Sequence, residues 1–261
     1  HVDFTVEVER SLRVLDGSVA VFCAKGGVEP QSETVWRQSE HFAVPKIAFV
    51  NKMDRLGADF EAALEAIRRR LQTNAVAVTA PLGQGESFAG VLDLISGETL
   101  TFDPADQGRT VLRVPFSPRE ATLAAPWRET LLEKLAEADD RFLELWMEGS
   151  FSPEDVRAAL RRATLSRALT PVLCGSALRN VGIQPVLDAV CDYLPSPLDV
   201  PAPVGRDAEG REEAVEPDPD APPVALVFKV LMENGRKLSF LRLYAGQIRE
   251  GDSLRNVTRK S

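Results

Sequence analysis

The chain has 261 residues, of which 44% are hydrophobic and 27% charged, as is typical of a globular protein that buries a sizeable core in more than one domain. Its formal net charge of −8 argues against binding to nucleic acid through bulk electrostatic attraction, because such binding needs clustered Lys and Arg. No apolar run reaches the roughly 20 residues that cross a membrane, so we expect no association with membranes.

Three cysteines, Cys23, Cys174 and Cys191, lie in apolar surroundings. Their number is odd, no pair has CxxC spacing, and no histidine cluster stands near them, so disulfide and metal sites are poor interpretations. We therefore predict buried, reduced thiols in a cytosolic protein, and no metal ligands in this chain.

The first part of the chain alternates between helix and strand patterns. Apolar residues at helical spacing predict helices at residues 2–15, 31–42 and 60–71. The apolar run at 18–24 predicts a central parallel strand covered on both faces, and residues 47–50 predict a second buried strand. This order of elements predicts an α/β fold with a mostly parallel sheet.

Residues 75 to 169 have a different character. Short strand patterns at 75–79, 88–95, 99–102 and 110–114, separated by glycines, predict an antiparallel sheet. A region rich in Ala, Leu, Glu and Arg follows, and Ser152-Pro153-Glu154-Asp155 then opens a helix with a capping-box pattern and proline in its first turn. We interpret this region as an α+β subdomain inserted into the parallel-sheet domain.

The chain then returns to the core sheet with a predicted strand at residues 170–174. The next helix is expected to pack on the sheet through Val186, Leu187, Val190, Cys191 and Leu194.

The last part of the chain predicts a second domain. Residues 195–222 are rich in proline and acid and predict a linker. Strand patterns at 224–231, 238–244 and 253–257, the first two joined by a turn with Asn234-Gly235, predict the start of a β-barrel.

The buried strand at residues 47–50 ends in Asn51-Lys52-Met53-Asp54, a set of polar side chains suited to a purine base. The Asp54 carboxylate can accept from the N1 and N2 groups of guanine together, whereas adenine offers no such pair of donors. The Asn51 amide can fix the neighbouring loop and the N7/O6 edge, and the Lys52 stem can cover the base plane. Such a site rejects a base that leaves its polar groups unpaired by about 10⁴–10⁵-fold. These residues alone are equally compatible with a capped turn at a strand end.

A second turn, Gly175-Ser176-Ala177, follows the predicted strand at residues 170–174. Its small residues let backbone N–H groups approach a ligand closely, and the Ala177 N–H is suited to donate to guanine O6. Ligands bind at the carboxyl ends of strands in open α/β sheets. The two turns together therefore predict a guanine-nucleotide site made by Asn51, Lys52, Asp54, Ser176 and Ala177.

Two stretches near the start of the sequence carry a family resemblance. Residues 1–17 (HVDFTVEVERSLRVLDG) and 27–38 (GVEPQSETVWRQ) closely resemble translation elongation factor G, and the resemblance covers nearly the whole chain. The Asn-Lys-Met-Asp stretch matches the guanine-specificity motif of that family, Ser176-Ala177 matches its second base-contacting turn, and residues 192–197 (DYLPSP) match the end of its GTPase domain. The turn at residues 232–235 is shorter than is usual in the family, which indicates a divergent branch or a paralogue.

The resemblance implies a domain arrangement. Residues 1–194 correspond to a P-loop-GTPase-like domain whose N-terminal part is missing, with the inserted subdomain at about residues 75–169. Residues 195–222 correspond to the linker, and residues 223–261 to the start of the β-barrel domain.

The resemblance also implies a function. The intact protein would bind GTP and GDP with Mg²⁺ and couple GTP hydrolysis to ribosomal translocation of tRNA and mRNA, as a cytoplasmic monomer that contacts ribosomal RNA and proteins. A role in ribosome recycling stays open. A ribosomal-protection or release-factor GTPase, and an interaction module that binds no nucleotide, stay open as well.

Two features bear on catalysis. His1 matches the histidine that closes the family's Asp-x-x-Gly-His element and orients the attacking water, although a terminal histidine is also compatible with a solvated side chain. No Gly-x-x-x-x-Gly-Lys-Ser/Thr motif occurs in the sequence, so the phosphate cradle and the Mg²⁺ ligands are expected outside it. We therefore predict that the chain is a fragment that hydrolyses no GTP by itself.

Overall fold

The computed structural model describes residues 5–207, 209–233 and 235–257. The chain forms two compact units, one made by residues 15–195 and the other by residues 5–14 together with residues 196–257. His1 lies outside the described residues.

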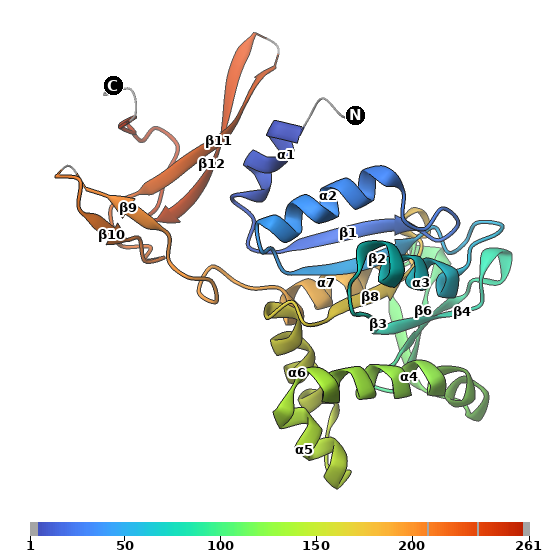
Figure 1. Ribbon diagram of the computed structural model, residues 1–261. Coiled ribbons are helices and arrows are strands. Elements are labelled where there is room, and N and C mark those ends of the chain that lie inside the picture. The colour runs from blue at the N-terminus through green and yellow to red at the C-terminus, as the bar shows by residue number, and fades with distance from the viewer. Residues whose placement is uncertain (1–4, 208, 234, 258–261) are drawn as a thin grey trace. The chain divides into compact units, whose positions relative to one another are not determined.

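The first unit is organised around a parallel sheet of four strands in the order β1-β2-β8-β3 (Figure 1). The strands are β1 (Ser18–Cys23), β2 (Lys46–Asn51), β8 (Thr170–Cys174) and β3 (Ala75–Ala77). Strands β2, β8 and β3 are buried on both faces because they are continuous apolar runs, with Asn51 at the end of β2 as the one partly exposed position.

Strand β1 differs from the prediction of a central, fully covered strand. It lies at the edge of the described sheet, and its first four side chains alternate between partly buried and exposed positions, with Phe22 buried near its end. Val19 and Val21 are 38% and 57% exposed. Their apolar character alone therefore did not distinguish an edge strand from a central one.

Helices α2 (Pro30–His41) and α3 (Phe60–Leu71) connect strands of this sheet, and α7 (Ile183–Tyr193) follows its last strand, β8. Helix α3 forms because Phe60, Leu64 and Ile67 recur at helical spacing and are fully buried. The Asp59 carboxylate caps its first turn by accepting from the Ala62 N–H at 2.9 Å. Three arginines in its last turn stabilise the helix, because their positive charges lie near the negative end of the helix dipole.

The predicted packing face of α7 is partly wrong. Val186, Ala189 and Tyr193 are buried, whereas Leu187 is 61% exposed and Cys191 is also exposed. The buried positions follow the 3.6-residue period from Val186, which turns Leu187 and Cys191 away from the sheet.

The three cysteines are free thiols and only Cys174 is buried, so the prediction of buried thiols is wrong for Cys23 and Cys191. Cys23 is partly exposed and Cys191 exposed. Burial raises the pKa of the Cys174 thiol to about 12, so this thiol stays protonated at neutral pH.

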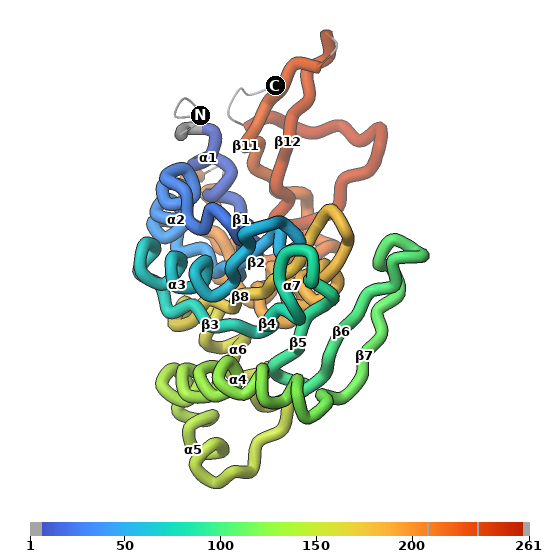
Figure 2. The backbone as a smooth tube through the Cα atoms, turned by 90° about the vertical axis from the view of Figure 1, so that its right-hand side faces the viewer, coloured from blue at the N-terminus to red at the C-terminus, as the bar shows by residue number. Residues whose placement is uncertain are grey.

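The region between β3 and β8, which we predicted to be an insert and call the insert below, contains an antiparallel sheet of four strands in the order β4-β5-β6-β7, and β5, β6 and β7 lie side by side in Figure 2. The strands are β4 (Thr79–Leu82), β5 (Gly90–Asp93), β6 (Glu98–Phe102) and β7 (Val111–Pro115). We predicted that residues 75–79 belong to this antiparallel sheet. Residues 75–77 form β3 instead, which pairs in parallel with β8 because these residues are apolar on both faces.

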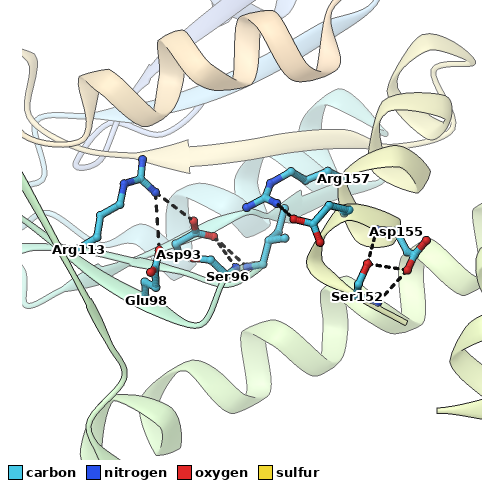
Figure 3. A network of polar contacts seen from close by, with 9 residues as sticks. Asp93, Ser96, Glu98, Arg113, Ser152, Asp155 and Arg157 are labelled. Carbon is cyan, nitrogen blue, oxygen red and sulfur yellow. Dashed lines mark hydrogen bonds and ion pairs between the residues drawn. The ribbon is translucent and has the colours of Figure 1, made fainter. Parts of the chain in front are cut away.

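Three helices complete the insert: α4 (Pro118–Ala138), α5 (Asp140–Glu148) and α6 (Pro153–Leu165). The predicted capping box at α6 is confirmed, since the Asp155 N–H donates to Ser152 Oγ at 3.3 Å and the Ser152 N–H donates to Asp155 Oδ2 at 2.8 Å (Figure 3). Figure 3 also shows Arg113 of β7 beside Asp93 and Glu98, which belong to the two preceding strands.

The second unit contains helix α1 (Thr5–Leu12), a short pair made by β9 (Val204–Arg206) and β10 (Glu212–Ala214), and a long hairpin made by β11 (Val224–Glu233) and β12 (Arg236–Ala245). The hairpin confirms two of the predicted strands. The third prediction is wrong, since residues 253–257 form no strand. Throughout the described residues, no helix is long and apolar enough to cross a membrane.

Asp139 gives a test of the insert's stability. Its carboxylate caps α5 by accepting from the Phe142 N–H at 2.8 Å, and it accepts from Arg162 Nε at 2.6 Å and Nη2 at 2.9 Å. The paired Arg162 guanidinium holds the pKa of the Asp139 carboxyl below its ordinary value. This contribution to stability is complete above the unfolded pKa of about 3.9 and is lost as pH falls through the lower folded pKa.

We predict that Asp139→Asn, which keeps the cap and removes the charge, lowers the free energy of unfolding at pH 7 by about 1–3 kcal/mol. Urea titrations at pH 7 and at acidic pH should show this difference shrink as pH falls. Asp140→Asn, at the exposed neighbouring position, serves as the control. Equal stability of wild type and Asp139→Asn at pH 7 would contradict the assignment.

Candidate nucleotide-base site

The ends of β2 and β8 bring the two predicted turns together. These strands are parallel neighbours in which Val50 stands opposite Cys174, so the residues that follow them emerge at the same edge of the sheet. The backbone joins the turns further, because the Met53 N–H donates to Gly175 O at 3.1 Å and the Gly175 N–H donates to Val50 O at 3.0 Å. The five predicted base-site residues therefore lie at the end of β2 and on the two adjacent loops that follow β2 and β8.

Gly175 is required where β8 leaves the sheet. A Cβ atom at this position would lie 2.3 Å from Val181 O and 3.0 Å from the Phe49 ring. A side chain would therefore push apart the strand end and the turn that follows it.

The Asn51 side chain links the two loops directly. Its Oδ1 accepts from its neighbour, the Lys52 N–H, at 2.7 Å and from the Ala177 N–H, across the site, at 2.9 Å. Asn51 thus bridges the two loops, which is the contact on which its predicted loop-fixing role depends. We expected the Ala177 N–H to face guanine O6. In this structure it donates to Asn51 Oδ1 instead.

Lys52 and Asp54 flank this link. Lys52 is exposed and has a φ of +67°, a left-handed conformation that bends the chain sharply after β2. The Asp54 side chain is only 8% exposed, and its Oδ2 lies 3.4 Å from Arg179 Nε. A partly enclosed carboxylate with a cation beside it is an acceptor suited to a pair of N–H donors.

The second loop is a compact turn that begins with Ser176 and includes the 3₁₀ segment η4 (Ala177–Arg179). Ser176 is fully buried, and its Oγ accepts from the Arg179 N–H at 3.4 Å. The turn is closed where Ser176 and Val181 exchange backbone hydrogen bonds of 2.8 and 3.0 Å. The Ser176 side chain therefore shapes the turn from within, while Ala177 is exposed at its surface.

Arg179 and Asn180 also contact residues of this site or its neighbouring loop, and we did not predict them from the sequence. Arg179 pairs with Asp54, and Asn180 donates from Nδ2 to Gln107 O at 3.1 Å. Their position directly after Ser176-Ala177 was the available signal. The involvement of Gln107 had no signal in the sequence, because that residue belongs to the insert.

The described residues contain no group of three or more His, Cys, Asp or Glu side chains placed to hold a metal ion. Around Asn51 and Asp54 the structure places hydrogen-bond acceptors at the ends of two neighbouring strands.

Residues 1–196 match the family model of the elongation factor Tu GTP binding domain. This match spans well over half of the sequence and includes both base-site turns. The chain belongs to this family of GTP-binding domains.

Within the family, the chain is similar to elongation factor G. It is 52% identical over 260 residues to elongation factor G 2 of Desulfotalea psychrophila, an alignment that covers 98% of this chain and 37% of the relative. It is 49% identical over 266 residues to elongation factor G of Salinibacter ruber, covering 99% of this chain and 37% of the relative. The chain thus spans little more than a third of the length of these curated relatives.

The fold is also similar to that of a solved structure. A crystal structure of a Thermus thermophilus protein matches with a TM-score of 0.77 and 28% identity, covering 98% of this chain and 36% of that chain. The arrangement of an α/β domain followed by a β-rich region is therefore shared with a longer protein.

The link made by Asn51 can be tested by substitution. Asn51→Ala removes the acceptor of two N–H groups, so we predict a loss of about 1–2 kcal/mol in the free energy of unfolding. Hydrogen exchange at the Ala177 amide should become faster. Asn51→Asp keeps an oxygen acceptor and should restore slow exchange, whereas equally slow exchange in all three proteins would contradict the link.

Proposed function

We propose that the whole protein containing this chain is a translational GTPase of the elongation factor G type. It binds GTP and GDP and couples GTP hydrolysis to the movement of tRNA and mRNA on the ribosome. The observation that carries this proposal is the pair of loops after β2 and β8, linked by Asn51, which present Asp54 and Ala177 at one edge of the sheet. The names of the similar relatives support it, and no observation favours a ribosomal-protection or release-factor role, or a module that binds no nucleotide.

In this proposal each base-site residue has a distinct role. The Asp54 carboxylate accepts from guanine N1 and N2, taking the place of its contact with Arg179. The Lys52 stem covers the base, and Asn51 holds the two loops in register. Ser176 shapes the turn from which the Ala177 N–H approaches O6. When the base binds, the Ala177 N–H either donates to O6 and Asn51 Oδ1 together or leaves Asn51 to donate to O6 alone.

The phosphate half of the site is proposed to come from other parts of the whole protein. The sequence contains no Gly-x-x-x-x-Gly-Lys-Ser/Thr motif, so the phosphate cradle and the Mg²⁺ ligands are assigned outside residues 1–261. His1 is assigned to orient the attacking water, by positioning it rather than by bulk proton transfer. Chemistry thus requires the whole protein, which we propose acts as a cytoplasmic monomer with ribosomal RNA and proteins as its partners.

The central role of Asp54 leads to a change of base preference. In the whole protein, Asp54→Asn replaces an acceptor of two N–H groups with an amide, and the loss of two charge-assisted hydrogen bonds should weaken GDP binding by about 10²–10³-fold. Xanthosine diphosphate should bind better to this variant than to wild type, because its additional carbonyl can accept from the new amide.

Competition against a fluorescent GDP analogue measures both affinities, with adenosine diphosphate as the test of base selectivity in wild type. Asp59→Asn is a matched control, because it changes the same residue type five positions away and keeps an N-capping oxygen for α3. Unchanged preference for GDP in Asp54→Asn would show that the base site lies elsewhere.

A further inference from the structure

The loop between β6 and β7, residues 103–110 of the insert, reaches the turn that carries Ala177. Two side chains make the connection: Asn180 donates from Nδ2 to Gln107 O at 3.1 Å, and Gln184 donates from Nε2 to Gly108 O at 2.7 Å. The acceptors lie more than 70 residues before the donors in the sequence. Two backbone carbonyls of the insert therefore bind the end of the Ala177 turn, through Asn180, and the first turn of the following helix α7, through Gln184.

The contact between the loop and the turn is close as well as polar. A Cβ atom on Gly108 would lie 2.9 Å from Asn180 O and 3.1 Å from Arg179 O. Gly108 also has a φ of +74°, which other residues adopt at a cost. Backbone thus packs against backbone here, and a shift of the loop would displace the turn.

The insert loop is internally braced. The Asp106 carboxylate accepts from the Arg109 and Thr110 N–H groups, each at 2.9 Å, and from Thr110 Oγ1 at 2.5 Å. The Gly108 N–H donates to Asp103 O at 2.7 Å. Hydrogen bonds within the loop therefore fix the positions of the Gln107 and Gly108 carbonyls independently of the turn.

The turn needs such external support. Asn180 has a φ of +54° and Gly182 a φ of +79°, so the chain reverses over a few residues. Ala177, Leu178 and Arg179 are exposed on this reversal. Beside them, between the turn and the insert loop, opens a cavity of about 910 Å³.

We propose that Asn180 and Gln184 are positioning residues for base recognition, which hold the Ala177 turn against the insert loop and so set its distance from the purine O6 edge. This inference rests on the proposed guanine site. According to this inference, the insert contributes to nucleotide affinity. A displacement of residues 103–110 would move the turn through Asn180, and would move the start of α7, which follows the turn, through Gln184.

The proposal predicts a specific pattern of affinities. Asp54 reads the N2 amine, which guanine has and hypoxanthine lacks, whereas the Ala177 turn faces O6, which both bases carry. Loosening the turn should therefore weaken the diphosphates of guanosine and inosine by the same factor. A small displacement of a binding group is costly, and the loss of two neutral hydrogen bonds corresponds to about 10-fold in affinity.

The test uses the whole protein with the double substitution Asn180→Gly and Gln184→Ala. Glycine adopts the left-handed conformation at position 180 without strain, and the substitution removes the side chain that carries the amide. Competition against fluorescent GDP measures the Kd of guanosine, inosine and adenosine diphosphates, and thermal unfolding reports the Tm. Arg109→Ala is the matched control, since Arg109 is an exposed residue of the same loop whose backbone contacts survive the substitution.

We expect the double variant to raise the Kd values of guanosine and inosine diphosphates about 10-fold each with their ratio unchanged, and Arg109→Ala to match wild type. Unchanged Kd values, or a changed guanosine-to-inosine ratio, would overturn the positioning role. If the double variant does not fold, Asn180→Gly and Gln184→Glu tested singly must show the same pattern for the proposal to stand. A wild-type protein that binds adenosine diphosphate as tightly as GDP would refute the guanine site itself.

Discussion

The hydrogen bonds accepted by Asn51 Oδ1 hold the candidate site together. This single oxygen accepts hydrogen bonds from the Lys52 and Ala177 N–H groups, which belong to loops separated by more than 120 residues in the sequence. This geometry depends on the parallel pairing of β2 with β8, which places both strand ends at one edge. The buried core beneath fixes that pairing, since Ile47, Val50 and Val172 are fully buried. Hydrophobic packing thus determines where a few polar atoms meet.

Two further sets of contacts support this link. Arg179 pairs with the Asp54 carboxylate, so that a carboxylate with little exposure has a partner when no base is bound. The insert supplies backbone carbonyls that accept hydrogen bonds from Asn180 and Gln184. The site is consequently supported by residues from the sheet, from the turn and from a subdomain that interrupts the sequence between them.

Much of this arrangement was predictable from the sequence. Short-range signals were reliable: the capping box at Ser152 and the run of buried residues before Asn51 describe local chemistry that folding preserves. Long-range features were less so. The exposure of Val21 depends on which strands pair with β1, and the contact of Gln107 with Asn180 depends on how the insert packs. Neither is encoded in the periodicity of a single segment.

A crystal structure of the whole protein with GDP would show whether Asp54 and the Ala177 turn together bind guanine. We expect both Asp54 carboxylate oxygens within hydrogen-bonding distance of guanine N1 and N2, with the O6 edge facing the turn that begins at Ser176. A guanine held by other residues, with Asp54 still paired to Arg179 alone, would contradict it.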